Sequence, residues 1–349
     1  MEFSTSKLDR KTILRGLRFA VIVSLFFSVL IIMLTIDREA LQNIMRDIEP
    51  VYLFLALIIL FLRWLAASLL LKTLVSAVGD KIPLYDAVKI YLSGAFIANV
   101  TPFASGGGPF QIFFLHKKGV NIGSSSVVII VQLLLRIFFF GSAALIFLIF
   151  FNDLVSRGYI PAGIFYTAFG GGLLVSLFIV LFTLLPRTAE KILQMIFSIK
   201  KIRLLVKRSY KIKRFLVKAR KELREFRRSL EFIGARKGYL LLGVLLTVLN
   251  WSLLFLLLPV ILYGLGGGAH FFQAYVMQTI FYLIIPFMPT PGASGIAEIG
   301  FASLFVSFIP GSLVGLVLFG WRLFSFYIVL LVGGYFALRE ISNLGSKKI

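Results

Sequence analysis

Three arginines lie inside apolar stretches of the chain, and arginine is the side chain best suited to binding phosphate. Arg63 occurs in LIILFLRWLAASLLL, Arg136 in IIVQLLLRIFFFG and Arg322 in LVLFGWRLFSFY. A guanidinium at the centre of a membrane helix costs at least about 2.5–3.5 kcal/mol, so it normally faces a polar cavity or a partner. The planar group binds phosphate through paired hydrogen bonds. We therefore expect the three to form a site for an anionic headgroup; the alternative is snorkelling or pairing with backbone carbonyls.

Few other polar residues accompany these arginines. Gln132 lies one turn before Arg136 on the same helical face. Gln111 and Glu298 each follow a Pro/Gly motif, where they would cap backbone or contact a lipid amine, and Glu298 is also the candidate for proton coupling. One carboxylate cannot neutralise three guanidinium groups, which leaves positive charge for a ligand. The predicted substrate-binding residues are Arg63, Arg136, Arg322, Gln132, Gln111 and Glu298.

Two Pro/Gly motifs, TPFASGGGPFQ at 101–111 and PTPGASGIAE at 289–298, interrupt stretches that are otherwise strongly apolar. Non-helical backbone is tolerated at membrane depth only where it is buried in protein or lines a wet cavity. Glycines allow a tight turn and the close approach of other groups. The motifs predict the tips of two hairpins, and close helix packing is the alternative. The predicted tip residues are Pro102, Gly106, Gly107, Gly108, Pro109, Pro291, Gly292 and Gly295.

The composition fixes the fold class in which these features sit. Of 349 residues, 59% are hydrophobic and 15% charged, and several apolar runs exceed the ~20 residues that cross a bilayer. We expect an all-α polytopic membrane protein that forms a single domain over 1–349. Six spans are predicted at 16–36, 51–79, 123–151, 162–186, 238–263 and 311–338, with re-entrant hairpins at 82–119 and 269–309.

The distribution of Lys and Arg predicts the orientation of the spans. If both termini are cytoplasmic, 31 of the 37 basic residues fall on the cytoplasmic side and only Arg38, Arg46 and Arg157 lie outside. Such an excess is the positive-inside pattern. It requires the first hairpin to enter from the cytoplasm and the second from outside.

The two halves of the chain also match each other weakly. A shift of 187 residues aligns several pairs, and a one-residue slip adds the two arginines: Trp64 with Trp251, Pro102 with Pro289, Gly108 with Gly295, Gln111 with Glu298, and Arg136 with Arg322. Because the paired spans run in opposite directions, we expect an inverted repeat of 16–151 and 162–338. Inverted repeats with broken helices near the midplane are typical of alternating-access transporters.

Residues 187–237 form a strongly basic segment with eighteen Lys and Arg. Apolar residues recur there at three- and four-residue steps, which predicts an amphipathic helix along the cytoplasmic membrane surface, in contact with anionic lipid. A coiled-coil partner is the alternative. The net charge of +22 therefore indicates membrane rather than nucleic acid, and homo-oligomerisation stays open.

The sequence lacks the residues that most kinds of catalytic site require. The chain has no Cys and only two His, so thiolate chemistry is excluded and a His-rich metal centre is not expected. No glycine run is followed by the Lys-Ser/Thr of a P-loop. We expect no metal site, no cofactor and no enzyme activity.

The motifs TPFASGGGPFQIFFLHKKGV (101–120) and PTPGASGIAEIGF (289–301) resemble the paired signatures of the lysylphosphatidylglycerol synthase/flippase membrane-region family. Pro291, Gly292, Gly295 and Glu298 match the second signature. The first is looser, since many relatives carry Gly-Glu where this chain has Gly107–Gly108 and then Gln111. The resemblance implies a domain that handles phospholipid or polyprenyl lipid. The soluble aminoacyltransferase domain of the best-known members is not expected here, because the chain ends at Ile349.

These observations predict a flippase-like translocase. It would move an anionic or aminoacylated phospholipid, or a polyprenyl phosphate, across a bacterial or archaeal cytoplasmic membrane. An ion-coupled carrier of a small anion needs a similar basic site and is one alternative. A membrane subunit of a lipid-modifying transferase is another.

Overall fold

The computed structural model describes residues 10–35, 49–150, 163, 222, 225–226, 228–229, 231–268 and 270–345. Every regular element in these ranges is helical, as expected for an all-α protein. Five helical stretches there are long and apolar enough to cross a membrane: Leu17–Thr35, Pro50–Ala77, Ile122–Ala143, Lys237–Gly264 and Gly311–Glu340. They correspond to five of the six expected spans. The sixth, 162–186, lies outside the described residues apart from Gly163, and so does most of the basic segment 187–237.

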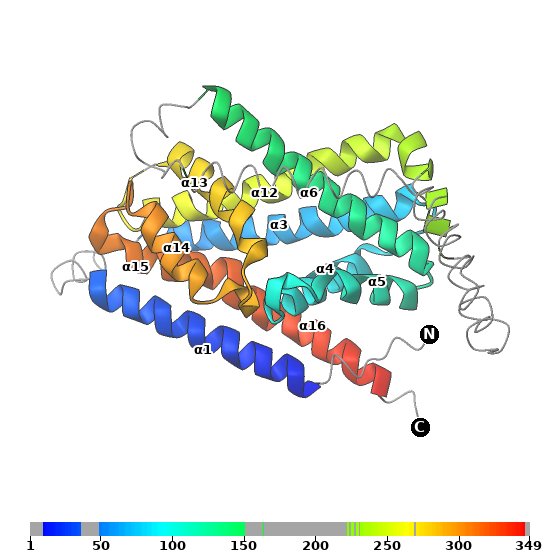
Figure 1. Ribbon diagram of the computed structural model, residues 1–349, viewed down its shortest axis with the longest axis horizontal. Helices are drawn as coiled ribbons and strands as arrows, with labels where there is room; N and C mark the ends of the chain where they lie inside the picture. Colours follow the sequence, from blue (N-terminus) through cyan, green and yellow to red (C-terminus); the bar gives the residue numbers. More distant parts are fainter. Residues whose placement is uncertain are drawn as a thin grey trace, which may run out of the picture.

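Two long helices, α3 (Pro50–Ala77) and α12 (Lys237–Gly264), run side by side along the middle of the molecule (Figure 1). They are antiparallel, because the N–H of Glu49 donates to the carbonyl of Gly264 at 3.3 Å. Close approach at the ends depends on glycine: a Cβ on Gly264 would lie 2.6 Å from Cβ of Tyr52. Helix α6 (Ile122–Phe150) crosses this pair.

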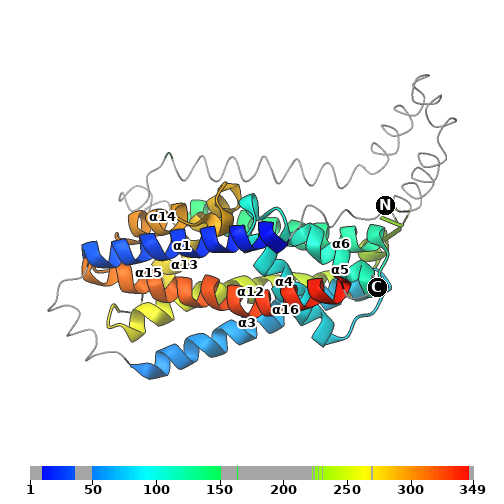
Figure 2. The same cartoon turned by 90° about the horizontal axis from the view of Figure 1, so that it is seen from below.

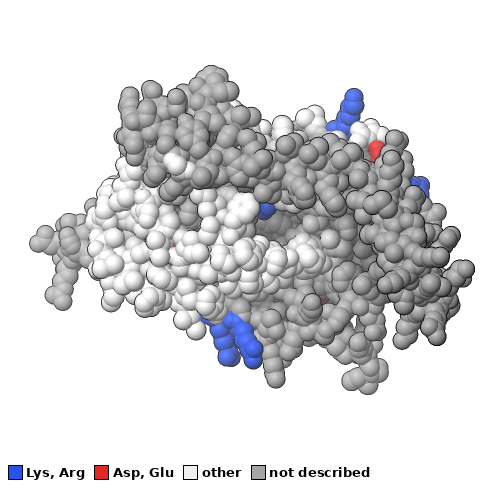
Figure 3. Space-filling view, viewed as in Figure 1, with Lys and Arg blue, Asp and Glu red and all other residues white. Residues whose placement is uncertain are grey.

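Two more long elements lie on the other side, as Figure 2 shows. Helix α1 (Arg10–Thr35) runs along α15 (Val314–Arg322), which continues through a π-helical turn (Leu323–Tyr327) into α16 (Ile328–Gly345). The last span is therefore one continuous rod with a π-turn in its middle. A π-turn inserts one extra residue into a helix, and such turns are frequent at functional sites. In the space-filling view the described surface is mostly uncharged, with basic side chains near its rim (Figure 3).

Two pairs of shorter helices approach from opposite ends of the molecule (Figure 1). The first is α4 (Leu84–Asn99) and α5 (Gly107–Lys117), joined by the 3-10 turn η2 (Pro102–Ala104). The second is α13 (Phe271–Ile284) and α14 (Ile296–Phe305), joined by the 3-10 turns η3 (Ile285–Phe287) and η4 (Pro291–Ala293). We call these hairpin 1 and hairpin 2. The short turn η5 (Gly311–Leu313) leads from hairpin 2 into α15.

Each hairpin packs against a long helix of the other half. The side of α4 lies so close to α16 that a Cβ on Gly333 would be 2.4 Å from the carbonyl oxygen of Leu92. At the base of hairpin 1, Lys118 and Asp86 form an ion pair of 2.8 Å that ties the two arms together. Hairpin 2 packs against α1, where Phe27 and Val23 border Gly295.

Candidate functional site

The tips of the two hairpins meet. The N–H of Phe103 in hairpin 1 donates to the carbonyl of Met288 in hairpin 2 at 3.3 Å. A Cβ on Gly292 would lie 3.1 Å from the carbonyl oxygen of Asn99 and 2.4 Å from the Phe326 ring, so the tip of hairpin 2 is tightly packed at this glycine. The two Pro/Gly motifs, far apart in the sequence, thus build one centre.

The tips share one backbone conformation. In each, a Thr-Pro pair is followed by two residues with positive φ: Phe103 and Ala104 at 54° and 52°, and Gly292 and Ala293 at 61° and 53°. The internal hydrogen bonds also match, from Ala104 to Thr101 and from Ala293 to Thr290. Thr101–Gly106 therefore corresponds to Thr290–Gly295, a shift of 189 residues, whereas the sequence comparison used 187. In this register the counterpart of Glu298 is Pro109, and Gln111 is not its equivalent.

Glu298 is the centre of a buried polar network. Its Oε1 accepts a hydrogen bond from Ser24 of α1 at 2.5 Å, and its Oε2 accepts the N–H of Gly295 at 2.6 Å. The same Ser24 hydroxyl lies 2.8 Å from that of Tyr327. Glu298 is fully withdrawn from the surface at 0% exposure. It therefore caps its own helix and also ties hairpin 2 to two long helices.

Arg322 is the ionic partner of this carboxylate. Its Nε lies 2.7 Å from Oε1 of Glu298, as an ion contact rather than a linear hydrogen bond. Its Nη1 donates to the carbonyl of Gly292 at 3.4 Å, and its guanidinium carbon sits 4.9 Å from the ring centre of Phe326. Its Nη2 is buried without a hydrogen-bond partner. Of the three arginines, Arg322 is the one that holds a hairpin tip, and its charge is compensated.

Arg63 lies on α3 beside a polar aromatic side chain. Its Nε is buried and has no hydrogen-bond partner. Its charge and that of Arg322 both act on the hydroxyl of Tyr282, on α13. The Tyr282 ring is 5.6 Å from Trp251 and 6.3 Å from Trp321. Arg63 and Arg322 thus share Tyr282 as a neighbour within electrostatic range.

Arg136 occupies a different position, on α6. Ile129, seven residues earlier on the same helical face, has its Cγ2 3.4 Å from where a Cβ on Gly108 would stand, so this face is turned toward hairpin 1. Gln132 shares the helix one turn before. Within the described ranges, no carboxylate forms an ion pair with Arg136.

Gln111 packs between the arms of hairpin 1. Atoms of its side chain lie 2.5–2.9 Å from where a Cβ on Gly94 of α4 would be. The tips also differ in exposure, because Pro102, Phe103, Ala104, Ser105 and Pro109 are exposed while Ala293, Ser294 and Gly295 are buried. The two tips also differ in the hydrogen bond that the threonine of the turn makes. Gly106 N–H donates to the Thr101 hydroxyl at 3.0 Å, whereas the equivalent Thr290 hydroxyl is buried without a partner.

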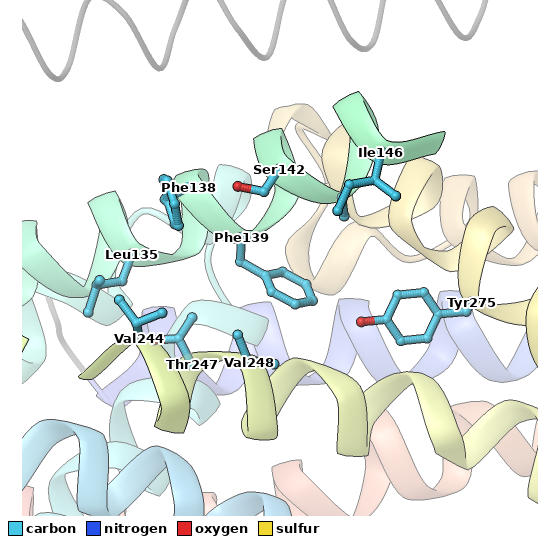
Figure 4. A pocket seen from close by; sticks show the side chains of 10 residues that line it. Leu135, Phe138, Phe139, Ser142, Ile146, Val244, Thr247, Val248 and Tyr275 are labelled. Atoms are coloured by element: carbon cyan, nitrogen blue, oxygen red, sulfur yellow. The ribbon is translucent and has the colours of Figure 1, made fainter. Parts of the chain in front are cut away.

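An apolar groove of about 330 Å³ lies between α6, α12 and α13. Figure 4 shows the rings of Phe139 and Tyr275 facing each other across it, between the α6 and α12 ribbons. Phe138, Ile146 and Val248 on its wall are exposed, so it opens at the side of the bundle. The other lining residues are Leu135, Ser142, Ala143, Val244 and Thr247.

Sequence reasoning missed Ser24, Tyr282 and Tyr327, which bind or border the charged groups. A single hydroxyl group in an apolar helix gives little indication in the sequence that it belongs to a functional site. The sequence indicated Glu298 as the plausible intramembrane partner of the arginines, but it did not show which of the three arginines would pair with it.

Comparisons with known proteins agree with this architecture. Residues 21–333 match the family described as the lysylphosphatidylglycerol synthase TM region. The chain is 28% identical over 316 residues to a UPF0104 membrane protein of Archaeoglobus fulgidus, a match that covers 90% of this chain and 93% of that protein. No solved structure matches. The match over most of the chain, together with its multi-pass helical fold, shows that it belongs to the lysylphosphatidylglycerol synthase transmembrane-region family.

Proposed function

We propose that this protein is a lipid translocase with two opposed re-entrant hairpins whose tips form its two gates. It moves a lipid with an anionic phosphate headgroup, aminoacylated or polyprenyl-linked lipids included, between the leaflets. The hydrocarbon chain stays in the bilayer while the headgroup crosses among the intramembrane arginines. The long spans form an inverted repeat, with both termini and the basic segment 187–237 at the cytoplasmic face of the cell membrane, where anionic lipid contacts that segment.

The observation that carries the proposal is the exposed tip of hairpin 1 at the meeting point with hairpin 2. Pro102, Phe103, Ala104 and Ser105 are exposed there, although the arms on either side are apolar. Irregular backbone at membrane depth requires protein or a wet cavity around it. A tip that is not covered by protein therefore supports a water-filled path on one side, closed on the other by the buried tip of hairpin 2.

The charges support the same function. Arg322 is neutralised by Glu298, which leaves the guanidinium groups of Arg63 and Arg136 for a headgroup. Broken helices at the midplane of an inverted repeat are the usual substrate sites of transporters. Family membership supports lipid as the substrate, since the family is named for a lipid-modifying enzyme's membrane region.

The test is transbilayer movement in proteoliposomes. Labelled phosphatidylglycerol, its lysyl ester, phosphatidylethanolamine and a polyprenyl phosphate are each followed with the wild type and with Arg63→Gln/Arg136→Gln. Selective movement of one or more anionic or lysylated lipids, lost in the double variant, is the expected result. If no lipid moves with protein that is folded, while a small anion such as phosphate is taken up, the chain is an anion carrier instead.

A further inference from the structure

We infer that Arg136 and the groove between α6 and α12 form one amphipathic site, which binds a phosphate group carried on a single hydrocarbon chain. This inference names the class of lipid that the proposed translocase would bind. It rests on the proposed function only for the biological role of that binding. Binding at the site can be measured without any translocation. The two proposals therefore fail separately.

The first step is that, among the residues whose placement is described, no carboxylate pairs with Arg136. In hairpin 2, the carboxylate of Glu298 is 2.7 Å from Nε of Arg322. The matching position of hairpin 1 is held by Pro109, which has no charge. Ile129 and Arg136 share the face of α6 that is turned toward hairpin 1. An uncompensated guanidinium in a membrane-spanning helix is expensive, so a phosphate that supplies the missing negative charge is strongly favoured there.

The second step is that the groove begins beside this arginine. Arg136 is not itself a lining residue, but Ala143, seven residues later and therefore on the same face of α6, lines the groove. The lining on α6 begins at Leu135, the residue before Arg136. From there the lining follows α6 as far as Ile146, which is eleven residues or about 17 Å of helix. A ligand with its phosphate at Arg136 would thus have a hydrocarbon channel next to it.

The third step concerns what the groove can hold. Its volume of about 330 Å³ and its almost wholly apolar wall suit alkyl chain, with Phe139 and Tyr275 closing across it (Figure 4). The exposed rim at Phe138, Ile146 and Val248 lets the chain enter from the bilayer. One narrow groove takes one chain. A lipid with two acyl chains would place its second chain outside, whereas a short alkyl phosphate fits within the groove and a polyprenyl phosphate would place there the part of its chain next to the phosphate.

Tryptophan fluorescence can report on this site. Trp251 on α12 lies 4.7 Å from Phe140 and is stacked at 6.4 Å on Phe139, a groove residue. A dodecyl phosphate brominated on its chain should quench Trp251 in the purified full-length protein in nanodiscs. The relevant signal is the quenching that disappears in Trp251→Phe. Dodecyl maltoside brominated in the same way is the uncharged comparison, and inorganic phosphate is the competitor that lacks a chain.

We expect saturable quenching by the alkyl phosphate, with about tenfold or greater loss of affinity in Arg136→Gln, since one charge-assisted contact is removed. Ser142→Phe, which fills the groove, should weaken binding to a similar extent. Lys117→Gln, an exposed basic residue at the end of α5, should bind as the wild type does. The site is wrong if Arg136→Gln leaves the affinity unchanged or if the maltoside binds equally well. If inorganic phosphate competes as strongly as unlabelled dodecyl phosphate, the site takes free phosphate and the groove has no part in it.

Discussion

Glu298 of hairpin 2 and Arg322 of the last span form a buried ion pair, with 2.7 Å between Oε1 and Nε. Their side chains are 0% and 5% exposed. Such a pair contributes little when intact, because both groups lose their hydration, but removal of one partner leaves an isolated buried charge. The pair is therefore a sensitive point of the structure.

We predict that Glu298→Gln destabilises the protein by about 3–5 kcal/mol, the usual effect of breaking a buried pair. The measurement is unfolding of the purified protein in micelles by a graded denaturant. The double variant Glu298→Leu/Arg322→Leu should be more stable than Glu298→Gln, because it leaves no unpaired charge. Ser24→Ala is the milder comparison, at about 1 kcal/mol for one hydrogen bond. A double variant no better than the single one would contradict the ion-pair interpretation.

The contact between the tips predicts a reversible block of transport. The chain has no Cys, so Phe103→Cys/Met288→Cys introduces the only thiols. The backbone N of Phe103 lies 3.3 Å from the carbonyl oxygen of Met288. The two residues are therefore neighbours, as the short span of a disulfide requires. If the tips must separate during the cycle, oxidation should stop lipid movement and reduction should restore it. Each single Cys variant is the control. Full transport by the oxidised double variant would show that the tips stay together.

The packing of hairpin 1 on α16 depends on a glycine. A Cβ on Gly333 would be 2.4 Å from the Leu92 carbonyl oxygen, so Gly333→Ala must push α4 and α16 apart. We expect destabilisation of about 1–3 kcal/mol, typical of overpacking. Gly141→Ala on α6 is the matched control, because no atom of the described residues lies within 4 Å of its added Cβ. The midpoint of thermal unfolding should be clearly lower for Gly333→Ala than for Gly141→Ala. Equal midpoints would mean that α4 and α16 can move apart without loss of stability.

The loop between α3 and α4 predicts a dependence of stability on pH. Burial raises the pKa of Asp80, and the nearby Glu225 carboxylate raises that pKa further. The native state then binds this proton more tightly than the unfolded chain does, so stability falls as the pH rises through the usual aspartate range toward the raised value. Asp80→Asn should increase the melting temperature at neutral pH. The gain should fade as the pH falls below ~3.9, where the carboxyl is protonated in both the native and the unfolded state. A gain independent of pH would exclude this cause.

Hydropathy and Pro/Gly placement were sufficient to predict much of this fold. The described spans begin and end close to the expected boundaries because a bilayer imposes a minimum length on apolar helices. The breaks in the apolar helices were recognisable from their glycines and prolines, although three of the four positive-φ residues of the two turns are Phe103, Ala104 and Ala293. The register of the repeat was harder: Trp64 and Trp251 match at a shift of 187 residues, whereas the tips match at 189, and a single shift cannot give both.

The sequence alone could not show which group pairs with each of the three arginines. Arg63, Arg136 and Arg322 look alike in their apolar contexts, yet only Arg322 lies against Glu298. That choice is made by the packing of α14 against α15, which depends on side chains from several helices. Ser24 and Tyr327 belong to the same network only because α1 and the π-turn bring them there.

The buried Thr290 hydroxyl, which has no hydrogen-bond partner among the described residues, distinguishes hairpin 2 from hairpin 1. In hairpin 1 the matching Thr101 hydroxyl already accepts the N–H of Gly106, where φ is −81°. In hairpin 2 that role belongs to Glu298, and Gly295 has φ of 86°. Glycine is the one residue that adopts both signs of φ without penalty. The same N–H of the two turns is thus held by a neutral threonine hydroxyl in hairpin 1 and by a charged carboxylate in hairpin 2, so only the second tip is tied to the ionic network.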